Sequence, residues 1–118
     1  MTDQLTANLS LSLDSTTIKD DKNWDLTATL TQVLQAIGTQ IITTSHAAIT
    51  IGDLASTDVG LCVLYNCDPT NYIEYGSTLN EWRLNPGEFA FARINPSKTI
   101  QAKANSASVK IEKYIVAK

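Results

Sequence analysis

Alternation of apolar and polar residues runs through the chain and predicts β-strands. In residues 5–13, "LTANLSLSL", every second residue is Leu or Ala, and the residues between are Thr, Asn or Ser. This period of two puts the apolar side chains on one face of a half-buried strand. Residues 24–33 alternate in the same way, whereas the polar run 14–23, with five charges, predicts a loop. The segment 30–37 also fits the spacing of a short helix, but the threonines at positions 27, 29 and 31 favour a strand.

Eight more short runs have the composition of strands. They lie at residues 40–45, 47–52, 59–65, 71–76, 81–84, 88–94, 99–104 and 108–116. Turn sequences separate them, at Gly52-Asp53, Asp68-Pro69, Asn85-Pro86-Gly87, Asn95-Pro96-Ser97 and Asn105-Ser106. Short strands spaced by about 8–12 residues are typical of an all-β sandwich or barrel. We therefore predict one domain over residues 1–118, an antiparallel, jelly-roll-like β-sandwich, in which residues 1–35 are a candidate N-terminal arm for assembly.

The stretch "LYNCDPTNYIEYG", residues 64–76, holds a polar cluster between apolar runs. Asn66, Asp68 and Thr70 stand two residues apart, as oxygen ligands of a calcium loop do. Such a loop also needs glycine at its sixth position and glutamate at its twelfth, where this chain has Asn71 and Ser77. An Asp-Pro pair suits a type I turn. We therefore predict structural turns, formed by Asn66, Asp68, Pro69 and Asn71 here and by Pro86 and Gly87 further along.

Charge is sparse and unevenly distributed. Hydrophobic residues make up 43% of the chain and charged residues 18%, below the roughly 25% of an ordinary soluble protein. The net charge of −3 argues against nucleic-acid binding. Residues 1–80 carry −7 and residues 81–118 carry +4. Either one surface mixes the two sets, or the acidic face of one subunit meets the basic face of another, which predicts a homo-oligomer, most simply a trimer.

Membrane and secretory features are missing from the pattern. No run approaches the ~18 apolar residues of a membrane-spanning helix. The N-terminus has neither the basic nor the apolar region of a signal peptide. We therefore expect synthesis in a cytoplasm, no membrane partner, and reduced, buried thiols at Cys62 and Cys67.

The residues needed for catalysis do not gather in the sequence. The chain has one histidine, His46, which lies between two strand runs and is expected at the surface. There is no G-x-S-x-G motif, no glycine-rich phosphate loop, and too few soft ligands for a structural zinc site. We predict no enzyme activity, no catalytic residue, no metal and no cofactor.

Several motifs resemble a class of small virion proteins of tailed bacteriophages. The matching elements are Ile37-Gly38-Thr39, Ile51-Gly52-Asp53-Leu54, Asn66-Cys67-Asp68, Thr70-Asn71-Tyr72, Leu84 with Pro86-Gly87-Glu88, and Lys103-Ala104. The resemblance covers about residues 36–116. Cys67 and Pro69 stand where the class more often has an aliphatic and a small residue, which stiffens the turn without changing its role.

The resemblance implies a non-enzymatic virion component. The role that the resemblance favours is that of a head decoration, or cement, protein, which is made in the bacterial cytoplasm and carried on the phage head. Its partners are then further copies of itself, as a homotrimer, and the major capsid protein, which it binds between capsomers. Alternatives are a tail or neck component, a receptor- or carbohydrate-binding module that stacks sugars on Trp82, Tyr72 and Tyr75, and an unrecognised enzyme using His46.

The residues expected at an interface are apolar and aromatic. They are Leu5, Leu9, Leu11, Trp24, Tyr72, Tyr75 and Trp82. The strand at residues 5–13 either lies inside its own sandwich or pairs with the edge of a neighbouring subunit, because unpaired strand edges seek partners.

Overall fold

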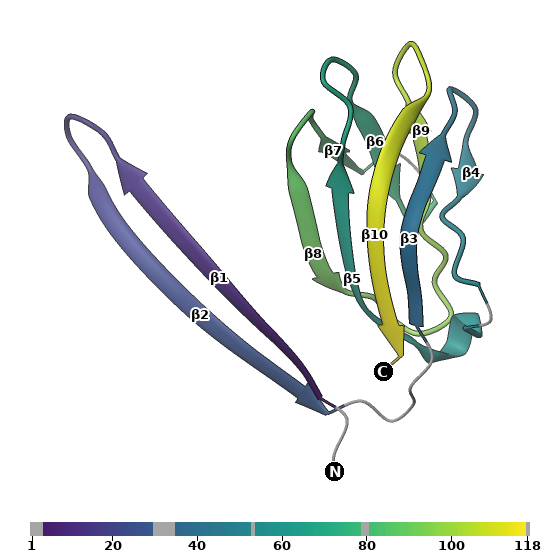
Figure 1. Cartoon of the computed structure of the whole chain (residues 1–118), viewed down its shortest axis with the longest axis horizontal. Helices are drawn as coiled ribbons and strands as arrows, with labels where there is room; N and C mark the ends of the chain where they lie inside the picture. The colour runs from purple at the N-terminus through teal and green to yellow at the C-terminus, as the bar shows by residue number, and fades with distance from the viewer. Residues whose placement is uncertain (1–3, 30–34, 53, 79–80, 118) are drawn as a thin grey trace. The chain divides into compact units, whose positions relative to one another are not determined.

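The computed structural model describes residues 4–29, 35–52, 54–78 and 81–117, and it is built almost entirely of strands (Figure 1). The chain forms two compact units, Met1–Gln32 and Val33–Lys118. The strands are β1 (Gln4–Asp14), β2 (Lys19–Thr29), β3 (Gln35–Ile42), β4 (Ala47–Ala48), β5 (Val59–Asn66), β6 (Ile73–Gly76), β7 (Trp82–Leu84), β8 (Phe89–Arg93), β9 (Gln101–Ala104) and β10 (Val109–Ala117), with one 3-10 turn at Ser56–Asp58. The predicted all-β, antiparallel class is confirmed.

The first unit is a long hairpin. β1 and β2 pair without interruption from Gln4 opposite Thr29 to Asp14 opposite Lys19. At the turn, the Ser15 hydroxyl accepts hydrogen bonds from the backbone N–H groups of Thr17 and Ile18. The chain reverses here because one serine oxygen satisfies two backbone donors.

The predicted loop at residues 14–23 is wrong for most of its length. Residues 19–23 continue β2, because each has a backbone partner on β1. Side chains on the polar face add cross-strand support: Asn8 Nδ2 donates to Asp25 at 2.5 Å, and Ser12 Oγ donates to Asp21 at 2.7 Å. Asp21 and Asp25 are therefore paired with polar residues on the solvated face of this sheet, and Asp14 forms an ion pair with Lys19 at 3.5 Å beside the turn.

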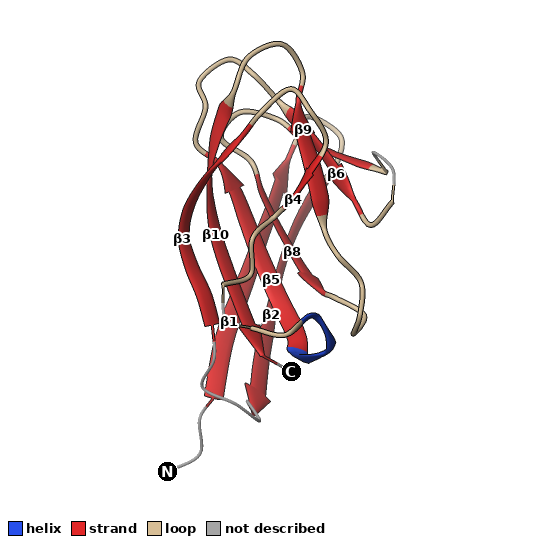
Figure 2. Cartoon of the chain, turned by 90° about the vertical axis from the view of Figure 1, so that its right-hand side faces the viewer, coloured by secondary structure: helices blue, strands red, loops and turns tan. Residues whose placement is uncertain are grey.

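The second unit holds two four-stranded antiparallel sheets, of order β3-β10-β5-β8 and β4-β9-β6-β7. Figure 2 shows this unit turned by a quarter from the first view. The pairing is nested: β3 pairs with β10, β4 with β9, β5 with β8, and β6 with β7. Two further pairings, β5 with β10 and β6 with β9, complete the sheets.

The core of this unit lies between the inner faces of its sheets. Ile111 and Ile115 of β10 and Leu64 of β5 are fully or almost fully buried in one cluster with Ile73 of β6. In the same sheet as Ile73, β9 contributes the small buried residues Ala102 and Ala104, so large and small side chains are combined in the core. The arrangement is sandwich-like.

Boundaries differ from the sequence-based expectation in three places. β3 begins at Gln35, so the helix alternative fails over residues 35–37, while residues 30–34 lie outside the described chain. The predicted strand 47–52 shortens to Ala47–Ala48, since only these two residues pair with β9. β1 pairs with β2 and is a strand of neither four-stranded sheet, so the alternative in which it completes one of these sheets is wrong.

Candidate functional site

The polar corner at residues 66–71 is organised by Asn66. This side chain is completely buried at the end of β5. Its Nδ2 donates to the carbonyl oxygens of Asn71, at 3.0 Å, and Leu84, at 3.1 Å, and its Oδ1 accepts from the N–H of Asp68 at 2.8 Å. One amide thus satisfies three backbone groups and joins the corner to the end of β7.

Asp68 caps the second half of the corner. Its Oδ2 accepts from the backbone N–H of Asn71 at 2.6 Å and of Thr70 at 2.9 Å. These two backbone hydrogen bonds lower the pKa of the Asp68 carboxyl, with a small opposing effect of desolvation. Within the described residues, no group of three His, Cys, Asp or Glu side chains is placed to hold a metal ion. The carboxylate of Asp68 is used to hold the backbone.

The turn at residues 85–88 packs beside this corner through backbone contacts. Gly87 has a φ of +76° and its N–H donates to the Asn66 carbonyl at 3.0 Å. The Asn66 N–H donates in return to the Glu88 carbonyl at 3.0 Å, and Glu88 Oε1 accepts from the Asn85 N–H at 2.7 Å. The positive φ explains the glycine, which tolerates this conformation at no steric cost. Pro86 precedes it in the same turn.

Replacing Asp68 with alanine is expected to lower the melting temperature at neutral pH. Because the folded-state pKa is depressed, the stabilisation is present above the unfolded pKa and disappears as the pH falls through the folded value. The difference between wild type and Asp68→Ala should therefore shrink below about pH 4. Asp68→Asn keeps an acceptor oxygen but does not titrate, and serves as the control. Thermal melts with and without calcium should coincide; a calcium-dependent rise would mean that these oxygens bind the ion.

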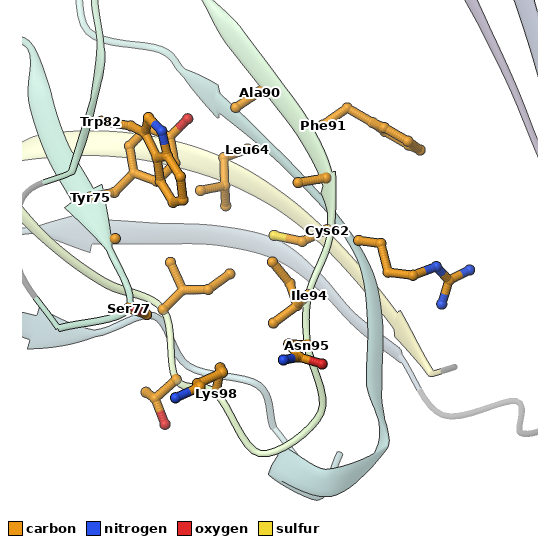
Figure 3. A pocket seen from close by; sticks show the side chains of 15 residues that line it. Cys62, Leu64, Tyr75, Ser77, Trp82, Ala90, Phe91, Ile94, Asn95 and Lys98 are labelled. Atoms are coloured by element: carbon orange, nitrogen blue, oxygen red, sulfur yellow. The ribbon is translucent and has the colours of Figure 1, made fainter.

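A cavity of about 390 Å³ opens between the edges of the two sheets, beside β8 (Figure 3). Its floor is formed by Cys62 and Leu64 of β5, and Tyr75 of β6 and Trp82 of β7 stand together on one side. The two rings lie 5.8 Å apart between centroids, tilted by 42°. Lys98 is the cation at the lower end of the cavity in this view. Such an apolar hollow with few polar groups is typical of small-ligand pockets.

The two cysteines lie in different environments. Both are free thiols; Cys62 is buried at the floor of the cavity, while Cys67 is only partly buried, contrary to the expectation that both are buried. The reason is that Cys67 follows the end of β5, where the inner face of the sheet stops. Burial raises the pKa of the Cys62 thiol to about 12, which keeps it protonated at neutral pH.

This difference predicts selective labelling. At neutral pH, a maleimide should modify Cys67 in the native protein and reach Cys62 only after unfolding, because a buried, protonated thiol is a poor nucleophile. Mass spectrometry of labelled peptides measures both sites, with Cys67→Ser as the control. Equal labelling rates at the two sites would contradict the burial of Cys62.

The hairpin carries one apolar face, which we call the hairpin face. Leu5, Ala7, Leu9, Leu11 and Leu13 of β1 share it with Trp24 and Leu26 of β2, because directly opposed residues of an antiparallel pair point to the same side. Toward the turn the same face also holds Lys22, opposite Leu11, and Asp20, opposite Leu13. Leu9 stands opposite Trp24, and the two are 46% and 49% exposed. Leu5 is half-buried. An uncovered apolar face of this size indicates an interaction surface.

The sheet β3-β10-β5-β8 carries a second apolar face on its outer side, which we call the sheet face. The register aligns Ile37, Tyr114, Val63 and Phe91 in one row across its four strands. The next row is Thr39, Glu112, Tyr65 and Phe89, and Ile41 stands beside Lys110 beyond it. Phe89 is 60% exposed, and Figure 3 shows Phe91 pointing away from the cavity residues. Four strands thus present a largely apolar outer surface.

The interface residues expected from sequence lie in three places. Leu5, Leu9, Leu11 and Trp24 share the hairpin face, and Tyr75 and Trp82 line the cavity. Tyr72 lies just before β6, beneath the guanidinium of Arg83, whose Cζ is 3.8 Å from the ring centroid.

The sheet face was missed by the sequence analysis. A signal for it exists in residues 89–93, where Phe alternates with Ala: the alanines face inward and the phenylalanines outward. The expected surface position of His46 is confirmed, since this side chain is exposed just before β4.

No protein-family model, curated protein or solved structure matches this chain. Across the described residues, no helix is long and apolar enough to span a membrane.

Proposed function

We propose that this protein is a non-enzymatic bacteriophage virion protein that decorates the head and stabilises it by binding the major capsid protein between capsomers. In this role its activity is a sum of interfaces, with apolar patches contributing most of the binding free energy. The proposal joins the sequence resemblance over residues 36–116 to the surfaces of the molecule.

The observation that carries the proposal is where exposed apolar side chains lie. Among the described residues, thirteen large hydrophobic side chains are exposed, and all but Ile18 and Trp82 belong to the hairpin face or the sheet face. Monomeric soluble proteins scatter such residues, whereas concentrated patches mark surfaces that a partner covers. A protein whose function is assembly needs such surfaces.

Strand connectivity supports a finer assignment, an eight-stranded jelly roll for residues 33–118. The nested pairing of β3 with β10, β4 with β9, β5 with β8 and β6 with β7 is that of one long antiparallel ribbon rolled up on itself. Rolling places the strands in two four-stranded sheets. Jelly rolls are used in viral capsid proteins and in lectins.

Particles provide the test. Heads that lack this protein should lose their DNA at lower temperature, or under milder osmotic or chelator shock, than complete heads. Adding the purified protein should restore their resistance, and a buffer addition serves as the control. Binding to isolated tails without binding to heads would overturn the decoration role in favour of a tail component.

A second candidate is carbohydrate binding at the cavity, favoured by Tyr75 and Trp82 beside each other at its side. Aromatic faces stack on sugar rings, and Trp82 is 60% exposed. A glycan array and its repetition with Trp82→Ala measure this directly. Glycan binding that disappears in Trp82→Ala would favour a receptor-binding module; no binding by the wild type would exclude it for the glycans tested.

A further inference from the structure

We propose that copies of this protein exchange their hairpins: the hairpin face of one subunit packs on the sheet face of a second copy. This contact between copies rests on the proposed decoration function, and it specifies which surfaces of two subunits touch. It differs from strand addition at a sheet edge, because the contact is made by side chains of two faces.

The two faces match in chemistry. The hairpin face offers branched aliphatic side chains and one indole, with Leu9 beside Trp24. The sheet face offers aromatic rings, with Phe89, Phe91 and Tyr114 exposed by 60%, 42% and 40%. Aliphatic side chains fill the spaces between rings, as they do where two sheets of a sandwich pack about 10 Å apart.

The area is sufficient for a specific contact. From the exposed fractions of its large side chains, each face offers roughly 500 Å² of apolar surface, which makes about 1,000 Å² buried in total. That value reaches the lower bound of specific protein interfaces. In a closed ring each subunit gives one hairpin and receives one, so the area per subunit doubles.

Length favours a second copy over the hairpin's own subunit. β1 and β2 have 11 residues each and span about 37 Å, whereas β10, the longest strand of the sheet with 9 residues, spans about 30 Å. A hairpin that covers one sheet therefore extends beyond it. Head-to-tail contacts use this reach to join neighbours, and around a three-fold axis they close.

Charge agrees with the same pairing. On the hairpin face the charges of Asp20 and Lys22 cancel, because Asp14, Asp21, Asp25 and Lys19 lie on the opposite, polar face of the hairpin. On the sheet face, Lys110 and Arg93 outnumber Glu112. A neutral face and a weakly basic face meet without like-charge repulsion.

Disulfide trapping tests the exchange in the full-length protein. Two variants are mixed in equal amounts, Leu9→Cys and Phe91→Cys, each in a Cys67→Ser background. Cys62 stays, because burial leaves it unreactive. After mild oxidation we expect a disulfide-linked pair that joins the hairpin peptide of one variant to the β8 peptide of the other.

The matched control replaces Leu9→Cys with Ser10→Cys, which lies on the opposite face of the same strand. It should give no linked pair above background with Phe91→Cys. A single chain carrying both Leu9→Cys and Phe91→Cys should form linked oligomers.

Three results would overturn the proposal: equal trapping by Ser10→Cys, trapping only within a single chain, or no trapping at all. In each case the head-binding assay decides the proposed function separately. Protein that binds and protects heads without hairpin trapping would keep the decoration role and remove the exchange.

Discussion

Asn66→Ala is expected to lower the free energy of unfolding by about 3 kcal/mol. The substitution leaves the carbonyls of Asn71 and Leu84 without their donor and the Asp68 N–H without its acceptor. Asn66 is completely buried, so water does not replace these partners. Without this amide, no side chain joins the end of β5 to Asn71 of the corner and to Leu84 at the end of β7.

Chemical denaturation with urea measures this effect, and the thermal midpoint should fall by roughly 10 °C. Asn85→Ala, at an exposed position of the facing turn, is the matched control and should change stability by less than about 0.5 kcal/mol. Equal effects at the two positions would mean that the buried amide does not organise the corner.

Trp24→Asp is expected to convert the proposed homotrimer into monomers. The indole is the largest side chain of the hairpin face and lies beside Leu9. A carboxylate there must be desolvated in the contact, and the loss of the indole removes an anchor residue of the type that dominates interfaces. A cost of several kcal/mol corresponds to a dissociation constant at least about 100-fold higher.

Sedimentation or native mass spectrometry at micromolar concentration and low salt gives the mass of the assembly. Asn23→Asp adds the same charge one residue away, on the polar face of β2, and should leave the trimer intact. A wild-type protein that is already monomeric under these conditions would contradict self-association in solution. A Trp24→Asp variant that stays trimeric would place the self-contact elsewhere.

The strands were predictable because alternation is a local signal. β1 was found within one residue at each end, since five apolar residues alternate with polar ones between Leu5 and Leu13. Residues 19–23 were misassigned for a physical reason: a highly charged run forms a strand only when another strand supplies its hydrogen-bond partners, and β1 supplies them here. The composition of residues 19–23 does not show that β1 pairs with them.

The candidate surfaces depended on long-range pairing. Ile37, Val63, Phe91 and Tyr114 stand in one row only once β3, β10, β5 and β8 are placed in order. The Asn66 amide likewise reaches Leu84, eighteen residues away. Sequence indicated that the corner was structural from Asp68-Pro69, but the residue at its centre and its partners follow from the tertiary arrangement.

Image reconstruction of heads mixed with purified protein tests the central claim most directly. Bare heads and heads with protein are reconstructed side by side, and the difference map locates the added density. The decoration role predicts three-fold clusters of density on the outer surface at the junctions between capsomers. Heads without added density, imaged together with tails that carry it, would contradict that role.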